Sequence, residues 1–445
     1  MSSIDCLPPE ILSHIFRETH SLIPLSISSR AGPLLISQVS RRWRHIAIKD
    51  ASLWQLVGIT ILPTTALKHA SIVKLWLRRS SRQPLSIAVW VDRFSQLSKK
   101  TFQVIRAIFH ELASVSDRWE SLHLSLPSYG RTLCAEFFAS HFPNLQSLTL
   151  TLGNWTTEDA WQIKPILQHA PALQKLTWSN QSSSTSFDVP FNCGIKVVPD
   201  PTWQTLTDVR LDTCIACTSV LHILRQCQKL VRLDLPHFYG GDIDIREPSS
   251  IHLPFLETIT IYQLRLNAGL SSLLNHLSCP NLKNFNYTCG YINRTWPQSP
   301  FEDFLARSQC NLQSLVLEYT AINESQLMRC LKQTSSSLKT LEVYDARGVT
   351  CVTDELLAML TMGKSMFGEP NDILCPNLQS LALHNVVACT NGALAAALQS
   401  RTACGISPMD IACSPLCSVN IRFSKRFIAD NEGDIAYLRE LAERT

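Results

Sequence analysis

One hydrophobic pattern recurs along most of the 445-residue chain. In the segments FPNLQSLTL, CPNLKNFNY, CNLQSLVLEY, SSLKTLEVY and CPNLQSLAL, leucine or another apolar residue fills the pattern Leu-x-x-Leu-x-Leu. The last two apolar positions are two residues apart, as on a short strand whose alternate side chains enter a core. Copies begin about 26 residues apart, with longer steps where segments are inserted, which is the signature of a leucine-rich repeat.

A helical pattern follows the strand pattern in each copy, as in TSVLHILRQC and NESQLMRCLKQT. A strand and a helix in constant order predict an α/β fold, a right-handed solenoid with a parallel sheet on its concave face and helices outside. Two insertions, residues 180–194 and 361–375, are predicted to be loops because they are rich in Ser, Asn, Gly and Pro.

The first fifty residues stand apart from the repeat. LPPEILSHIFRETHSL begins with a helix-start signal at Leu7 to Glu10, and LLISQVSRRWRHIAIKDASLW continues with apolar residues at helical spacing. A helical unit of this size cannot bury a large core. A small bundle with surplus apolar surface is suited to docking on another protein.

The order and spacing of four pieces in this segment resemble an F-box: Leu7-Pro8 with Ile11, Ile15-Phe16, Val39-Ser40 with Trp43, and Leu53-Trp54. With its C-terminal leucine-rich repeats, the chain is similar to the F-box-like families of mushroom-forming fungi. The resemblance implies the substrate-recognition subunit of a Skp–cullin–F-box ubiquitin ligase, in which the F-box binds a Skp-type adaptor and, through it, cullin, while the repeats hold a protein substrate.

The same resemblance implies the adaptor-binding residues, which would be Leu7, Pro8, Ile11, Ile15, Val39 and Trp43. Alternatively, Ile15 and Trp43 form the core of the bundle, because a fifty-residue unit needs its large apolar groups inside. The rival function keeps the fold but places the F-box in a scaffold or adaptor protein outside any ligase.

We expect four regions. Residues 1–54 form the F-box, 55–115 a connecting region with the first irregular strands, 116–425 the leucine-rich repeats, and 426–445 a capping helix with Ile435, Leu438 and Leu441 on one side.

The side chains that flank the core positions of each strand point out of the concave face and are candidates for binding a substrate. Asp208 beside Arg232, and Arg210 beside Asp234, predict either a polar recognition patch or a solvated charge ladder. Aromatic and charged residues further along predict a hot spot for a basic peptide, although Tyr is also common on strand surfaces. The predicted substrate-binding residues are Arg210, Arg232, Asp234, Tyr262, Glu318, Glu342, Tyr344 and His384.

Composition narrows the function classes. Hydrophobic residues make up 45% of the chain and charged residues 17%, which is typical of a folded protein. The net charge of +4 gives no case for a nucleic-acid surface or a membrane anchor. Without a secretory signal at the N-terminus, the 16 cysteines are expected to be free thiols in a cytoplasmic or nuclear protein.

Candidate chemistry is sparse. Cys214 and Cys217 have zinc-like or redox-like spacing, and Cys413 with Cys417 forms a looser pair, but the pairs are too far apart in a repeat array to converge on one metal. The chain lacks the phosphate-binding, zinc-protease and serine-hydrolase motifs. We predict no catalysis, cofactor or metal; the alternative of a different class is an enzyme with a loop site around Cys193 or Cys214.

Overall fold

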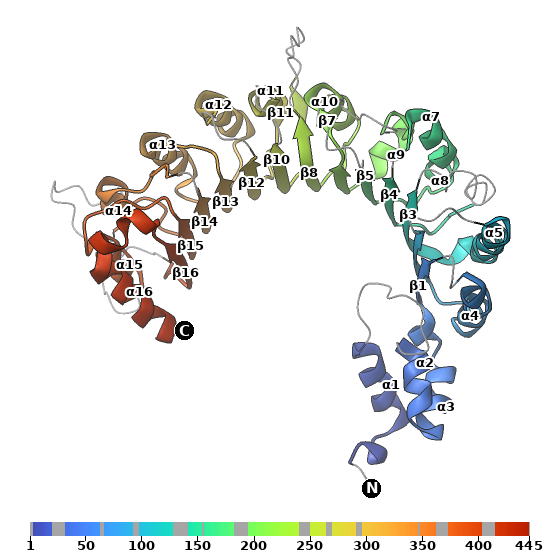
Figure 1. Ribbon diagram of the computed structural model, residues 1–445. Coiled ribbons are helices and arrows are strands. Elements are labelled where there is room, and N and C mark those ends of the chain that lie inside the picture. Colours follow the sequence, from blue (N-terminus) through green and yellow to red (C-terminus); the bar gives the residue numbers. More distant parts are fainter. Residues whose placement is uncertain are drawn as a thin grey trace. The chain divides into compact units, whose positions relative to one another are not determined.

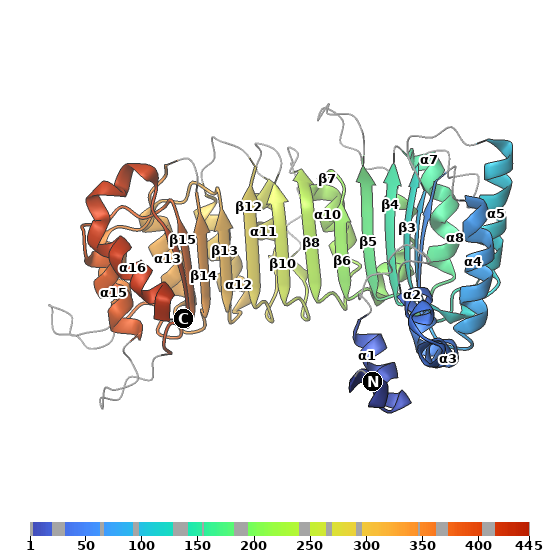
Figure 2. The same cartoon turned by 60° about the horizontal axis from the view of Figure 1, so that its bottom comes forward.

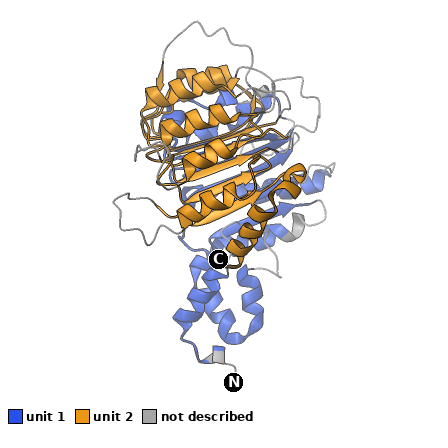
Figure 3. Cartoon of the chain, turned by 90° about the vertical axis from the view of Figure 1, so that its left-hand side faces the viewer, with its two compact units in different colours: residues 1–213 blue, residues 214–445 orange. Residues whose placement is uncertain are grey.

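The computed structural model describes residues 3–19, 32–62, 66–91, 98–127, 141–153, 155–181, 195–239, 250–263, 269–290, 296–345, 348–361, 373–402 and 414–444. The chain forms two compact units, Met1–Thr213 and Cys214–Thr445, which Figure 3 colours separately. Within the two predicted insertion loops, residues 182–194 and 362–372 lie outside the described ranges.

Unit 1 begins with a helical bundle, which lies beside the first strand and its helix (Figure 1). Its elements are the 3₁₀ turn Ser3–Cys6, α1 (Pro9–Glu18), α2 (Gly32–Val39), α3 (Arg41–Lys49) and the 3₁₀ turn η2 (Ala51–Trp54). The core of the bundle contains Leu12, Phe16, Ile46, Ala47 and Leu53, all buried.

Six parallel strands follow the bundle in unit 1 and pair in chain order. They are β1 (Leu56–Ile61), β2 (Leu85–Val91), β3 (Trp119–Pro127), β4 (Ser147–Gly153), β5 (Lys175–Gln181) and β6 (Asp208–Asp212). The helices between them are α4 (Ala66–Arg79), α5 (Lys99–Ala113), α7 (Thr157–Ala160), α8 (Lys164–Gln168) and α9 (Asp200–Thr205), with 3₁₀ turns at Ser116–Arg118, Trp161–Ile163 and Ile195–Val197.

The strand-then-helix order starts earlier than the sequence pattern indicates. Residues 55–115, which we predicted to be a connecting region with irregular strands, contain β1, α4, β2 and α5, and β1 pairs with β2 in continuous parallel register. This part of the chain is therefore more regular than predicted. Its strands are rich in Ile and Val rather than in the spaced leucines of the later copies.

Unit 2 continues the same order with seven parallel strands, while the short β7 pairs with β8, and β9 with β11. The strands are β7 (Ile215–Ala216), β8 (Arg232–Tyr239), β9 (Ile251–His252), β10 (Thr258–Gln263), β11 (Leu277–Ser278), β12 (Asn284–Cys289), β13 (Ser314–Glu318), β14 (Thr340–Tyr344), β15 (Ser380–His384) and β16 (Ser418–Arg422). The helices are α10 (Cys217–Leu224), α11 (Gly269–His276), α12 (Gln298–Ser308), α13 (Glu324–Thr334), α14 (Asp354–Leu360), α15 (Ala393–Thr402) and α16 (Glu432–Arg444), with 3₁₀ turns at Lys425–Phe427 and Ala429–Asn431.

Alternation along each strand places the core between sheet and helices. On β13, Leu315 and Leu317 are fully buried, whereas Val316 and Glu318 are only half-buried. Helices α10–α13 cover one face of the unit 2 sheet, and no helix in the described part of unit 2 lies over the other face (Figures 1 and 2). Each leucine enclosed in this way stabilises the fold by about 1.5–3 kcal/mol. The predicted fold class, an α/β repeat solenoid with a parallel sheet after a small helical bundle, is confirmed.

Charged side chains fasten one repeat of unit 2 to the next by binding the free backbone groups at helix ends. The Glu324 carboxylate accepts hydrogen bonds from the amides of Thr353 and Leu356 at the start of α14, at 2.8 and 3.3 Å. At the other end of α14, the buried Arg401 guanidinium donates to the Leu360 carbonyl at 2.6 Å. Helix ends leave such groups unpaired, so these side chains replace the missing partners.

The C-terminal helix is held by a buried acid. Asp434 on α16 is fully buried and accepts hydrogen bonds from the amides of Gly392 and Ala395, at 2.9 and 2.7 Å, at the start of α15. The carboxylate therefore caps α15 and binds α16 to it. None of the helices in the described ranges combines the length and the apolar character needed to span a membrane.

Candidate functional site

The first helix begins where two prolines keep the backbone extended. Pro8 has φ −56° and ψ 150°, because a residue that precedes a proline is excluded from the helical region. Pro9 takes the first helical position, where its missing N–H costs nothing. The Arg42 side chain of α3 donates a hydrogen bond to the Leu7 carbonyl, which ties this entry segment to the bundle. Pro8 is exposed and Leu7 is half-buried.

Helix α1 has apolar residues on two sides. Leu12 and Phe16 are buried in the bundle, whereas Ile11 and Ile15 are 47% and 36% exposed. The bundle thus fills its core from one side of α1 and leaves the second side open to solvent. Ile15 therefore points outward and does not belong to the core of the bundle.

Helix α3 starts at a serine cap that also positions the tryptophan. The Ser40 hydroxyl accepts a hydrogen bond from the Trp43 amide at 3.1 Å. The Trp43 ring lies 4.8 Å from that of Phe16, centroid to centroid, and the residue is half-buried. Trp43 therefore contributes to the packing of the bundle, the alternative that the sequence had left open for it.

The end of α2 adds a second exposed apolar pair. Val39 is 59% exposed and Leu35, one turn earlier, is 47% exposed. We call Ile11, Ile15, Leu35 and Val39 the exposed apolar stripes, because each pair is four residues apart on its helix and so shares a face. Sequence reasoning missed Leu35, although its spacing to Val39 repeats that of Ile11 to Ile15. Large apolar groups left open on so small a bundle are typical of a contact surface.

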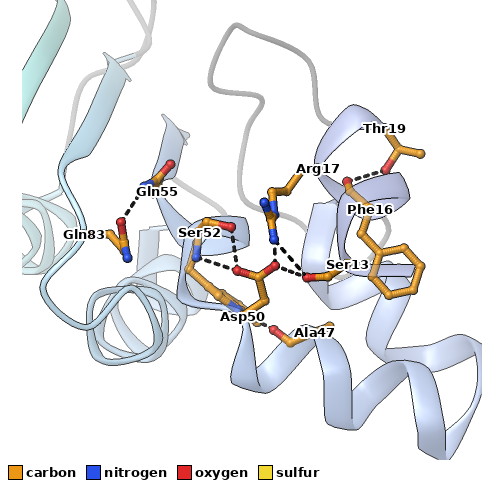
Figure 4. Close-up of polar contacts among 10 residues, drawn as sticks. Ser13, Phe16, Arg17, Thr19, Ala47, Asp50, Ser52, Gln55 and Gln83 are labelled. Atoms are coloured by element: carbon orange, nitrogen blue, oxygen red, sulfur yellow. Dashed lines mark hydrogen bonds and ion pairs between the residues drawn. The ribbon is translucent and has the colours of Figure 1, made fainter. Parts of the chain in front are cut away.

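A half-buried carboxylate holds the bundle together (Figure 4). Asp50, which follows α3, accepts hydrogen bonds from the Ser13 hydroxyl, from Arg17 Nε at 3.1 Å and from the Ser52 amide at 3.0 Å. Burial alone would raise the pKa of Asp50, but these donors outweigh it and hold the pKa below its ordinary value. The ionised carboxylate therefore links α1, the end of α3 and the turn η2.

Trp54 joins the bundle to the first repeat of unit 1. Its ring is fully buried, packs edge-on against the ring of Trp76 at 4.7 Å, and carries the Arg79 guanidinium 4.5 Å above it. The indole N–H donates to the Ala47 carbonyl at 2.8 Å. Gln55 adds a hydrogen bond to Gln83 at 2.9 Å, also drawn in Figure 4. The bundle is thus packed on α4 without an intervening linker.

The helix-free sheet face of unit 2 brings together several predicted substrate-binding residues. Glu318 lies opposite Tyr344, and Tyr344 opposite His384, on adjacent strands β13, β14 and β15. Glu342 shares this face because it lies two residues before Tyr344. Tyr262, on β10, is 37% exposed on the same face.

The predicted charge lattice is divided between the units. Asp208 and Arg210 lie on β6 in unit 1, whereas Arg232 and Asp234 lie on β8 in unit 2. Both arginines are exposed and both aspartates are half-buried. That these residues bind a substrate, or form a ladder of ion pairs instead, stays a prediction.

Seven of the twelve described cysteines are buried, as expected of packing residues. Cys217 is buried at the start of α10, and burial raises the pKa of its thiol to about 12. The thiol therefore stays protonated and is a poor nucleophile or metal ligand. Cys214 is half-buried, while Cys193 and Cys413 lie outside the described residues. Within the described ranges, no three His, Cys, Asp or Glu residues converge on a possible metal position.

Comparison with known proteins identifies the N-terminal bundle. Residues 4–60 match the F-box-like family model, a range that covers α1 to α3, η2 and most of β1. The chain therefore carries an F-box-like domain. A search of curated protein sequences finds no match.

Among solved structures, the chain is similar to that of the Rad7 and Elc1 complex in yeast, with 15% identity and a TM-score of 0.35, over 82% of this chain and 95% of that chain. It is also similar to a protein from Bacteroides fragilis, with 11% identity and a TM-score of 0.28, over 82% of this chain and 74% of that chain.

Proposed function

We propose that the protein is the substrate-recognition subunit of a Skp–cullin–F-box ubiquitin ligase, present in the cytoplasm or nucleus. Its F-box-like domain would bind a Skp-type adaptor and, through it, cullin, and its sheet would bind a protein substrate. The chain would act by holding two proteins close together, which makes ubiquitin transfer effectively intramolecular, and not by catalysis of its own.

The observation that carries this proposal is the position of the exposed apolar stripes on a domain that matches the F-box-like model. The resemblance to an F-box assigns Ile11, Ile15 and Val39 to the adaptor, with the core as the alternative for Ile15, and all three side chains are exposed. Leu7 and Pro8 precede α1 and add to the same proposed interface. Trp43, packed on Phe16, would support the interface by fixing α1 against α3.

The test is co-purification of the full chain with a Skp-type adaptor and a cullin. The double variant Ile11→Asp with Val39→Asp places charges in the stripes without touching the buried core. Burial of one aliphatic side chain is worth about 1.5–3 kcal/mol. Because the variant removes two such side chains from the interface, we expect the affinity for the adaptor to fall at least about a hundredfold.

The matched control is Phe255→Asp, which changes a side chain that is 55% exposed in unit 2 and should leave adaptor binding intact. Circular dichroism should show that both variants keep the fold. Undiminished adaptor binding by the stripe variant would refute the proposed interface. Capture of the adaptor without cullin would instead favour a scaffold outside any ligase.

A further inference from the structure

The helix-free face of unit 2 concentrates negative charge between two strands. Glu318 on β13 and Glu342 on β14 are diagonal neighbours, because Glu318 pairs with Tyr344 and Glu342 with Val316. Diagonal neighbours on adjacent strands are about 7–8 Å apart between their Cα atoms. Two half-buried carboxylates at this separation repel each other, and a cation placed between them would remove that repulsion.

Each carboxylate has a neutral partner only. Thr288 donates its hydroxyl to Glu318 at 2.9 Å, and Tyr344 donates its hydroxyl to Glu342 at 2.6 Å. Neither carboxylate has a basic partner in the described part of the chain, so each retains capacity to accept further hydrogen bonds. Arg422 on β16 lies in the same row of side chains, two strands from Tyr344.

Aromatic rings beside the carboxylates are held in place. The ring of Tyr344 meets that of His384 edge-on at 4.5 Å, which fixes its orientation. Burial and the two nearby carboxylates raise the pKa of Tyr344, so its hydroxyl remains a donor to Glu342. On the opposite side, the ring of Tyr262 reaches over Gly290, where an added Cβ would be 3.1 Å from the tyrosine oxygen.

Two further polar atoms on this face have no hydrogen-bond partner among the described residues. Asn286 donates from its amide nitrogen to Thr260 at 3.3 Å, but its Oδ1 is buried and unbonded, and so is Nε2 of His384. Asn286 pairs with Val316, which in turn pairs with Glu342. Buried polar atoms of a native protein normally have partners.

We infer that this acidic-aromatic patch, formed by Tyr262, Glu318, Glu342, Tyr344 and His384, binds an extended basic segment of a partner protein, with an arginine side chain between the two glutamates. A guanidinium is planar and has five donors, so it can bond two carboxylates at once and pack against a tyrosine ring. The inference rests on the proposed function, since it names the class of substrate that the receptor recognises.

The experiment is selection of binding peptides from a random display library on the immobilised full chain. Peptides selected on the wild type should be enriched in arginine relative to the library. The double variant Glu318→Gln with Glu342→Gln, which keeps the side-chain shapes, should lose this enrichment. Its matched control is Asp303→Asn with Glu355→Gln, two exposed acids on the helices of unit 2, which should retain it.

A selected peptide resynthesised with citrulline in place of arginine should bind the wild type at least about tenfold more weakly, because citrulline lacks the charge. The inference is overturned if the peptides carry no excess of basic residues, or if the patch variant and its control bind the arginine peptide equally. Co-purification of the adaptor with the wild-type chain separates the two proposals. Adaptor binding by a wild-type chain that selects no basic peptides would refute the patch alone, and basic selectivity without adaptor binding would refute the ligase function alone.

Discussion

Replacement of Asp50 by asparagine should loosen the N-terminal bundle, because the carboxylate links α1 to the end of α3. Asparagine keeps one acceptor oxygen but turns an NH₂ group towards hydroxyl or guanidinium donors. Hydrogen bonds to a charged group contribute about 1.5–3 kcal/mol in net terms. The bond from Arg17, whose side chain is 50% exposed, adds only about 0–1 kcal/mol. We therefore expect a loss of about 2–3 kcal/mol in the opening free energy of the bundle.

The assay is amide hydrogen exchange of the full chain by mass spectrometry. A loss of this size should accelerate exchange in α1 roughly 30- to 150-fold, since 1.4 kcal/mol corresponds to a factor of ten. The strands of unit 2 should be unaffected. Asp117→Asn, an exposed aspartate of unit 1, is the matched control. Unchanged exchange in α1 of the Asp50→Asn protein would refute this account of the network.

The pH dependence provides a second check. The pKa of Asp50 is lowered by folding, so the unfolded chain binds the proton more tightly than the folded one. The stabilisation is therefore complete above the unfolded aspartate pKa of about 3.9 and is lost as the pH falls through the lower folded pKa. The difference between wild type and Asp50→Asn should be constant near neutral pH and should disappear only in acid.

Three further changes test other parts of the fold. Asp434→Ala should lower the free energy of unfolding by about 1–3 kcal/mol, because the amides that begin α15 lose their buried acceptor. Urea unfolding followed by fluorescence measures this loss, and a variant as stable as wild type would contradict the capping role. Glu324→Gln should cost about 0.5–2 kcal/mol through the weakened cap of α14, read from the same unfolding curves. Iodoacetamide at mildly alkaline pH should alkylate the exposed Cys6 but not the buried Cys217, because the Cys217 thiol has a pKa of about 12. Peptide mapping of the alkylated protein would show which cysteine is modified.

The repeat could be predicted from the sequence because each strand needs the same alternation to enclose its core. Leu315 and Leu317 were placed in the core by pattern alone, and both are fully buried. The strands β1 and β2 escaped this recognition because β-branched residues, as at Ile59 and Val89, replace the spaced leucines. Their membership of the sheet is seen only in the structure, where β1 pairs with β2 in parallel register.

The contacts within the candidate site were less predictable, because they join residues far apart in the sequence. Asp50 meets Ser13 across 37 positions, and nothing in the local pattern of either residue indicates this pairing. Trp43 and Ile15 were equally apolar in the sequence, and only the packing of three helices turns one towards the core and the other outwards. The exposed stripes, by contrast, follow from spacing, since residues four apart must share a helix face.

The junction at Trp54 has a consequence for how a docked protein is presented. Only Gln55 separates the buried tryptophan from the first strand, which begins at Leu56. No flexible linker therefore lies between the F-box-like domain and this strand. Any protein seated on the N-terminal helices would share the orientation of the first strands of unit 1. Under the proposed function, the packing of Trp54 against Trp76 and Arg79 would set the orientation of the bound adaptor relative to those strands.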